Sequence, residues 1–222
     1  NRDPMGAVKL AVPAPGTSDR TEVVPVAVIP EHEARTIAVG QKKTAVGCER
    51  KIRRAKGRRP AGVGNPASPV LLGGLDTSGN AWAVRVVGNL AYVADGDAGL
   101  QMIDVSNPAS PVRLGAFESA AYSLAVQVVG NLAYVGDVYE GLQVFDVSNP
   151  ASPVRLGSYT TPDWAVDLQV VGNLAYVADV GGGLQVIDVS NPASPARIAA
   201  FDTSGSASAA QVAGNLAYVG DA

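Results

Sequence analysis

The residues on which most enzymes and metal sites depend are scarce in this sequence of 222 residues. It contains one histidine, His32, and one cysteine, Cys48. Nucleophilic triads and most general-base schemes use a histidine, and zinc sites use several Cys or His ligands. We therefore expect no catalytic residues, no cofactor and no metal site. A single cysteine cannot form a disulfide within the chain, so cysteine usage says nothing about the redox compartment.

Long apolar runs and aromatic residues are also rare. No run approaches the roughly 18 apolar residues that a membrane-spanning helix needs, and no signal peptide is recognisable. Aromatic residues make up 5% of a chain that is 47% hydrophobic, so a core must be built from Val, Leu, Ile and Ala. The 25 glycines and 15 prolines are typical of many short strands joined by tight turns.

Positive charge is nearly absent from most of the chain. Residues 61–222 hold 4 Lys/Arg against 14 Asp/Glu, whereas residues 1–60 hold 13 against 6. The stretch "ERKIRRAKGRRP" (49–60) is basic enough for nucleic acid or heparin, but it lacks the interleaved aromatics that stack on bases. We expect residues 1–60 to be a basic leader that does not bind nucleic acid. It is predicted to be disordered or separate from the rest, with "TEVVPVAVIP" (21–30) its most strand-like stretch.

The rest of the sequence is a repeat with a period of 42 residues. "GNLAYV" begins at Gly88, Gly130, Gly172 and Gly214, and "NPASP" begins at Asn65, Asn107, Asn149 and Asn191. Neither series contains an insertion. A fixed period of this length is the sequence signature of a solenoid or a propeller.

Each unit predicts four short antiparallel strands. In the first unit these are residues 83–88, 90–95, 100–105 and 112–117. Gly-Asn between the first two strands is a strong hairpin signal, and the prolines of "SNPASP" exclude a helix before the fourth. Four strands in about 40–45 residues predict an all-β fold, a β-propeller with four-stranded blades. We favour it over a parallel β-helix or a leucine-rich solenoid, because those have shorter rungs and lack two hairpin-type turns per unit.

The propeller is expected to be incomplete. Three full units span residues 82–117, 124–159 and 166–201. A lone fourth strand is predicted at 70–75, and a first and second strand at 208–213 and 216–220. We expect residues 61–222 to be a fragment of a longer array. We also expect an open arc with exposed blade faces, through which the chain could self-associate.

The repeated centre resembles a known family. "GNLAYVADGDAGLQMIDVSNPASPVRLGAF", with its "GL-x-x-[IVF]-D-V-S-N-P" core, is similar to the LVIVD repeat of bacterial and archaeal proteins, over about residues 65–222. The resemblance implies a propeller-like fold and a secreted or cell-surface setting. It implies no catalytic residues. Residues 1–60 fall outside it.

The repeated aspartates, and the repeated Gly, Asn and Pro residues of the turns, are predicted to have structural roles in the turns. Aspartates at the ends of the second and third strands could be calcium ligands, and "DGD" (95–97) has alternate acids. The corresponding "DVYEG" and "DVGGG" lack that spacing, so we expect the aspartates to bind backbone N–H groups instead. The predicted structural turn residues are Gly88, Asn89, Asp95, Asp104, Asn107, Pro108, Gly130, Asn131, Asp137, Asp146, Asn149, Pro150, Gly172, Asn173, Asp179, Asp188, Asn191 and Pro192.

The other two connections of each unit change in sequence while keeping their length. "DGDAG", "DVYEG" and "DVGGG" join second to third strands, and "DTSGNAW", "ESAAYSL" and "TTPDWAV" join the units. In a propeller both emerge on one side, here called the variable face. Variable loops on a rigid scaffold are where ligands bind. The predicted ligand-binding residues are Trp82, Asp97, Glu118, Tyr122, Tyr139, Glu140, Asp163, Trp164 and Asp167.

These patterns favour a non-catalytic interaction module that binds an unidentified protein or glycan through the variable face. One alternative is a propeller enzyme of the hydrolase or lyase type whose active site needs further blades. It would have to use paired carboxylates. A purely structural spacer is the other alternative, but it would not need aromatic loops that vary.

Overall fold

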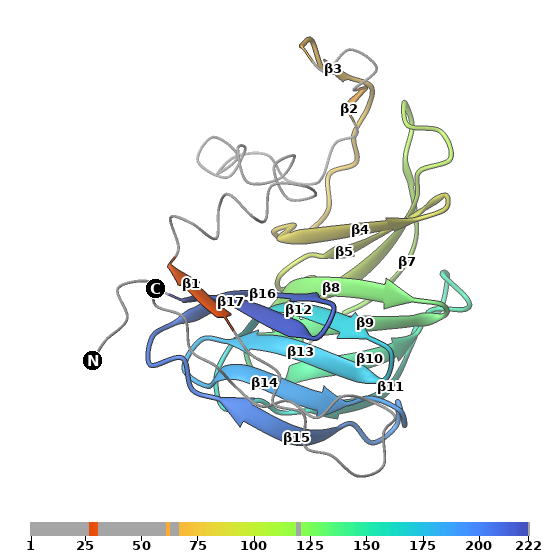
Figure 1. The fold of residues 1–222 in the computed structure, drawn as a ribbon. Helices are drawn as coiled ribbons and strands as arrows, with labels where there is room; N and C mark the ends of the chain where they lie inside the picture. The colour runs from red at the N-terminus through yellow and green to blue at the C-terminus, as the bar shows by residue number, and fades with distance from the viewer. Residues whose placement is uncertain (1–26, 31–60, 63–66, 119–120, 222) are drawn as a thin grey trace.

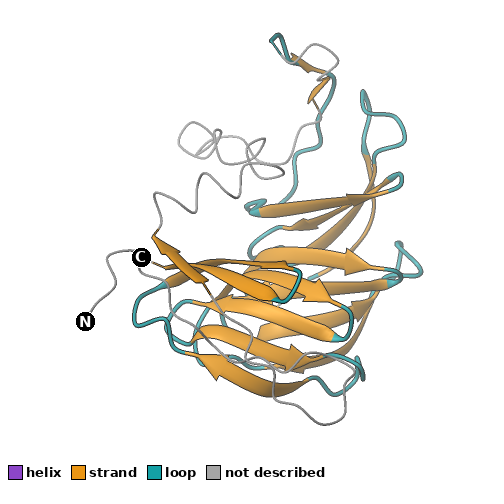
Figure 2. Cartoon of the chain, viewed as in Figure 1, coloured by secondary structure: helices purple, strands orange, loops and turns teal. Residues whose placement is uncertain are grey.

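Strands are the only regular elements in the part of the chain that the structure describes. The structure is a computed structural model in which residues 27–30, 61–62, 67–118 and 121–221 are described (Figures 1 and 2). Among these residues no helix is long and apolar enough to cross a membrane. The prediction of an all-β chain of four-stranded antiparallel sheets is therefore confirmed.

Three of the sheets have four strands each and are called blades 1, 2 and 3. Blade 1 consists of β4 (Ala83–Val87), β5 (Leu90–Ala94), β6 (Leu100–Asp104) and β7 (Val112–Phe117). Blade 2 consists of β8 (Ser123–Val129), β9 (Leu132–Asp137), β10 (Gly141–Asp146) and β11 (Val154–Tyr159). Blade 3 consists of β12 (Ala165–Val171), β13 (Leu174–Asp179), β14 (Gly183–Asp188) and β15 (Ala196–Phe201). Within each blade, strands that follow one another in the chain pair side by side and antiparallel.

Turn chemistry explains where these strands end. The first two strands of blade 3 are joined by Gly172-Asn173, and Gly172 has a φ of +58°, which glycine adopts at little cost. The third and fourth strands are joined by the proline-containing turn. Their register shifts by a residue in every blade, in blade 2 between Val144 and Phe145. Such a bulge increases the local twist of the sheet.

The blades stack face to face, and the apolar core lies between them. One buried cluster joins blade 1 to blade 2 through Met102, Val126 and Phe145, and Phe117 and Phe145 are in ring contact with centroids 4.7 Å apart. A second cluster joins blade 2 to blade 3. Because both sheet faces are covered, the side chains of the third strands do not alternate between buried and exposed: Leu142, Val144 and Phe145 are all at most 1% exposed.

A half-blade follows blade 3. It consists of β16 (Ala207–Ala213) and β17 (Leu216–Asp221), which pack on blade 3 through a third cluster. The free edge of β17 pairs in parallel with β1 (Ala27–Pro30), so β1 occupies the place of a third strand. This strand lies within residues 1–60, in the stretch "TEVVPVAVIP". Most of residues 1–60 lies outside the described residues, so the proposed domain division stays a prediction.

The lone strand predicted at 70–75 is shorter than expected. Only β3 (Val70–Leu71) is a strand, and it pairs with β2 (Ala61–Gly62) rather than with a blade. Leu75 nevertheless packs against blade 1, at the position where Phe117, 42 residues later, packs against blade 2. The sequence pattern therefore identified this repeat position correctly. Residues 72–75 do not form a strand because a strand must pair with the edge of another strand, whereas Leu75 lies against the face of blade 1.

The sheets follow one another around an arc in Figure 1. No strand pairing between described residues joins blade 1 to the half-blade, so the structure contains no closed sheet. The described residues form three complete blades and a partial one.

Candidate functional site

In the turns between third and fourth strands, side chains of the turn accept hydrogen bonds from backbone N–H groups of the same turn. The carboxylates of Asp104, Asp146 and Asp188 each accept a hydrogen bond at 2.8 Å from the backbone N–H two residues later. These bonds favour the charged form and lower the pKa of each aspartate. Asn107, Asn149 and Asn191 each accept a bond from an N–H in the same way. Their polar groups stabilise the turns.

In blades 1 to 3, the aspartates that end the second strands are fully buried, and they hold the variable loops at their bases. The Asp95 carboxylate accepts bonds from the Thr77 hydroxyl at 2.6 Å and the Gly79 N–H at 3.1 Å. Burial raises the pKa of Asp95, and those two bonds oppose the effect. Asp179 accepts bonds from the N–H groups of Gly182 and Asp163, so it links both variable connections of blade 3.

Asp137 has the same role in blade 2. It accepts bonds from the N–H groups of Tyr139 and Glu140, at 2.9 and 3.1 Å. In the described part of the chain, no group of three His, Cys, Asp or Glu side chains is placed to hold a metal ion. The observed partners of these acids are hydroxyl and backbone N–H groups of the loops that they support.

Two of the predicted ligand-binding aromatics form a cluster across the junction of blades 1 and 2. The Trp82 Nε1–H donates to the Tyr122 hydroxyl at 3.1 Å, and the two rings meet edge to face with centroids 6.1 Å apart. Asn80 donates a second bond to the same hydroxyl at 3.3 Å. The Tyr122 ring also lies against Gly96, where an added Cβ would meet it at 3.0 Å. Trp82 is held in place and yet remains 49% exposed.

The other predicted aromatics are exposed on neighbouring loops. Tyr139 is 71% exposed and Trp164 is 50% exposed, and neither is in ring contact with the Trp82–Tyr122 pair among the described residues. Trp164 occupies the repeat position of Tyr122, one blade further on. Tyr139 and Trp164 thus add exposed aromatic surface to the variable face outside the Trp82–Tyr122 cluster.

The predicted acidic residues fall into two groups. Glu140 binds Arg155 with an Oε2–Nη1 distance of 2.5 Å, Asp163 accepts the Trp164 N–H, and Asp167 accepts the Ala210 N–H of the half-blade at 3.1 Å. Asp97 and Glu118 are exposed. Three of the five acids thus contribute to the structure of the loops and of the blade junctions, in addition to any ligand role.

The sequence analysis missed the glutamines that join consecutive blades. The Gln127 side chain binds the backbone of Val170, and the Gln169 side chain binds the backbone of Val212. Both pairs are 43 residues apart. The recurrence of Gln at 127, 169 and 211 was visible in the sequence. The hydrogen bonds of Gln127 and Gln169 were not predictable from it, because main-chain groups of another unit have no sequence signature.

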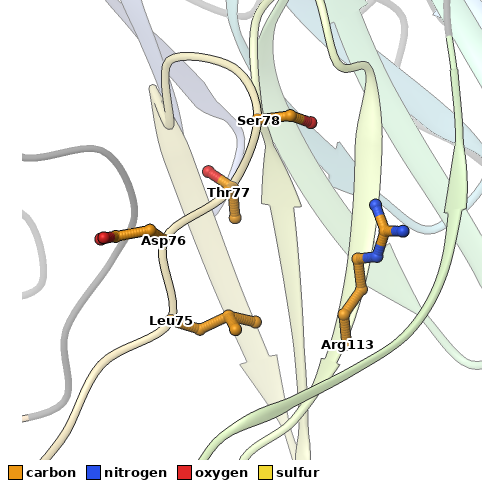
Figure 3. A pocket seen from close by; sticks show the side chains of 5 residues that line it. All are labelled: Leu75, Asp76, Thr77, Ser78 and Arg113. Atoms are coloured by element: carbon orange, nitrogen blue, oxygen red, sulfur yellow. The ribbon is translucent and has the colours of Figure 1, made fainter.

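A pocket of about 270 Å³ lies outside the predicted ligand-binding residues. It is lined by Leu75, Asp76, Thr77, Ser78 and Arg113, and Figure 3 shows Leu75 and Arg113 on opposite sides of it. None of the predicted ligand-binding residues lines it. Arg113 also donates to Gln101 at 3.4 Å, so its guanidinium is partly engaged in holding β7 to β6.

Stacked four-stranded sheets of one repeat, with constant turns at one end and varied loops at the other, define a propeller-like repeat module. The model of the LVIVD repeat matches residues 78–118, 121–161 and 164–203. The chain belongs to the LVIVD repeat family.

Comparison with solved structures supports the same architecture. The fold is similar to that of the computationally designed Ika8 protein, with a TM-score of 0.60 and 14% identity over 75% of this chain and 50% of that one. It is also similar to the computationally designed Ika4 protein, with a TM-score of 0.56 and 14% identity over 65% of this chain and 87% of that one. The chain thus spans half the length of Ika8. At such identity the likeness concerns the fold alone. A search of curated proteins gives no match.

Proposed function

We propose that this chain is a non-catalytic interaction module of a secreted or cell-surface repeat protein, and that it binds a protein or a glycan through the variable face. One observation carries the proposal. Trp82, Tyr139 and Trp164 are 49%, 71% and 50% exposed, and all three lie in the connections that differ from repeat to repeat. Exposed aromatics on a rigid scaffold are the usual anchors of binding surfaces.

The surroundings of these aromatics favour a binding surface over an active site. Glycosidase-type chemistry needs two carboxyl groups free to exchange protons across a substrate. Of the acids adjacent in sequence to these aromatics, Asp163 accepts a backbone N–H at 2.9 Å and Glu140 is paired with Arg155. A ring face beside a carboxylate suits a sugar, which offers C–H surface and hydroxyl groups, or a basic side chain of a protein partner.

The test uses the position of the two tryptophans, which are the only ones in the sequence. Trp emission of the full chain is titrated with cellohexaose as a neutral glycan probe and with a lysine decapeptide as a basic peptide probe. Calorimetry on the Trp82→Ala/Trp164→Ala variant follows. We expect one probe to give a saturable change in emission, and the double variant to bind it at least about tenfold more weakly.

The matched control is Val129→Ala. Val129 is 45% exposed and adjoins the Gly130-Asn131 turn at the opposite end of the strands. We expect it to bind as the unmodified chain does. Undiminished binding by the double tryptophan variant would exclude the variable face as the site.

A further inference from the structure

Blade 2 departs from its two neighbours at one repeat position in the variable face. Glu140 stands there, whereas blade 1 has Ala98 and blade 3 has Gly182. The same loop carries Tyr139, which is 71% exposed. The backbone of this loop is fixed, because the Asp137 carboxylate accepts the N–H groups of both Tyr139 and Glu140. Blade 2 therefore holds an acid beside an exposed aromatic ring at a position where its neighbours have no charge.

The arginine of the fourth strand responds to that acid. In blades 1 and 3 this arginine donates to the buried glutamine 12 residues earlier, at 3.4 and 3.2 Å; the pairs are Arg113–Gln101 and Arg197–Gln185. Arg155 of blade 2 has the same strand register opposite Gln143. Its Nη1 nevertheless lies 2.5 Å from Glu140 Oε2. Because the backbone is the same, the side chain of Glu140 explains why Arg155 turns away from Gln143.

Blade 2 is consequently one cation short. Gln143 is fully buried, and neither of its amide atoms has a hydrogen-bond partner among the described residues. A buried amide without a partner is costly. The side chains of Arg155 and Glu140 are 34% and 32% exposed, and an ion pair exposed to that degree contributes little to stability. In this structure one guanidinium has two acceptors within the blade and satisfies only Glu140.

We propose that Glu140 is the subsite for a basic side chain of a protein partner, and that Arg155 is the occupant that this side chain displaces. The partner's Lys or Arg pairs with Glu140, next to Tyr139, whose ring face attracts cations. Arg155 then moves to Gln143, as the arginines of blades 1 and 3 do, and both acceptors are satisfied. This inference rests on the proposed function and narrows its ligand from a protein or glycan to a protein with a basic segment.

Charge favours a basic occupant over a neutral glycan. Residues 61–222 hold 14 Asp/Glu against 4 Lys/Arg. An acidic surface attracts a basic partner and speeds its association. A neutral glycan supplies no charge to replace Arg155 at Glu140, so it would gain nothing from the exchange.

The first test is calorimetry of the full chain with the lysine decapeptide. Glu140→Gln removes the acid that receives the basic side chain, and we expect binding to weaken about tenfold. The matched control is Glu118→Gln, which removes the same charge from an exposed acid of the variable face. We expect it to weaken binding less than about threefold. Equal losses in the two variants would mean general charge attraction and would overturn the proposal.

The second test separates displacement from simple attraction. Because the chain places Arg155 on Glu140 rather than on Gln143, moving it has a cost. Arg155→Ala removes that cost, so we expect the decapeptide to bind about two- to fivefold more tightly. Arg197→Ala is the matched control, since it changes the net charge equally but its arginine bonds a glutamine. If Arg155→Ala binds no more tightly than Arg197→Ala, nothing is displaced and the proposal is wrong.

The movement of Arg155 is observed through the ¹⁵N–¹H resonances of the Gln143 side-chain amide. This group is fully buried, so the peptide cannot touch it. We expect its resonances to shift as the decapeptide saturates the chain, while those of the Gln185 amide stay in place. Unchanged Gln143 resonances at saturation would exclude the exchange.

Failure of this inference is distinguishable from failure of the proposed function. Binding of cellohexaose but not of the decapeptide, lost in the double tryptophan variant, would refute a basic partner and leave the variable face as the binding site. Binding of neither probe would count against both.

Discussion

Gln127 binds both main-chain groups of Val170, the residue 43 positions further along the chain. The Val170 N–H donates to Oε1 at 2.7 Å, and Nε2 donates to the Val170 carbonyl oxygen at 3.2 Å. Val170 lies on the first strand of blade 3, whose outward N–H and C=O groups have no neighbouring strand to pair with. The amide side chain of Gln127 therefore satisfies the N–H and C=O groups of this edge strand, as a neighbouring strand would.

Removal of this amide should destabilise the junction. Gln127→Ala leaves the N–H and C=O of Val170 without these partners, so we expect the free energy of unfolding to fall by about 2 kcal/mol. Urea unfolding followed by circular dichroism measures it. The control is Gln211→Ala, in which an exposed glutamine is lost and the change should stay within about 0.5 kcal/mol. Equal losses in both variants would contradict the role given to Gln127.

Blade 1 lacks the same bond and should gain from it. Arg85 stands at the repeat position of Gln127, and its Nε is buried without a hydrogen-bond partner among the described residues. An arginine cannot accept a bond from a backbone N–H. Arg85→Gln is expected to bind Val128 in blade 2 and raise the free energy of unfolding by about 1 kcal/mol. Thermal unfolding of the two proteins would show it, and a lower melting temperature for the variant would count against this account.

The features of the fold that repeat could be predicted from the sequence, whereas those that do not repeat could not. Strands and turns were predictable because Gly-Asn and "SNPASP" recur at every 42nd residue and fix the local geometry. The pairing of β1 with β17 was not, since a parallel partner 191 residues away in sequence, as Tyr218 is from Ala27, leaves no local pattern. Of the candidate site, the variable connections and their exposed aromatics could be predicted. The engagement of Asp167 by Ala210 could not, because it depends on how closely two blades approach.

Blade 2 differs from its neighbours in a way that only the structure shows. In blade 3, Arg197 donates to the buried Gln185 at 3.2 Å, but Arg155 turns instead to Glu140 and to the Ser158 hydroxyl. Gln143, the counterpart of Gln185, is left fully buried with neither amide atom bonded within the described structure.

Substitution of the two glutamines by leucine should therefore have opposite effects. We expect Gln143→Leu to stabilise the chain by about 1 kcal/mol, because an unsatisfied polar group is replaced by an apolar one of similar size. We expect Gln185→Leu to destabilise it by about 1–2 kcal/mol, because bonds to Arg197 and to the Gly182 carbonyl are lost. Chemical denaturation of both variants measures the difference, and a loss of stability in Gln143→Leu would contradict the assignment.

Asp146 and Asp95 should titrate on opposite sides of the ordinary aspartate pKa of about 3.9. Backbone hydrogen bonds lower the pKa of Asp146, so its contribution to stability is present above that value and is lost as the pH falls through the folded-state pKa. Burial raises the pKa of Asp95, so its contribution is present at low pH and is lost as the pH rises through the folded-state pKa. Carboxyl carbon shifts followed by NMR give both midpoints. A higher midpoint for Asp146 than for Asp95 would contradict the two environments.

The most direct test of ligand binding at the variable face is ¹⁹F NMR of the full chain labelled with 5-fluorotryptophan. Because Trp82 and Trp164 are the only tryptophans, the spectrum has one resonance from the connection before blade 1 and one from the connection before blade 3. The account predicts that titration with a probe that binds by calorimetry, cellohexaose or the lysine decapeptide, shifts both resonances with the calorimetric dissociation constant. Saturation of the calorimetric signal while both resonances stay in place would contradict it.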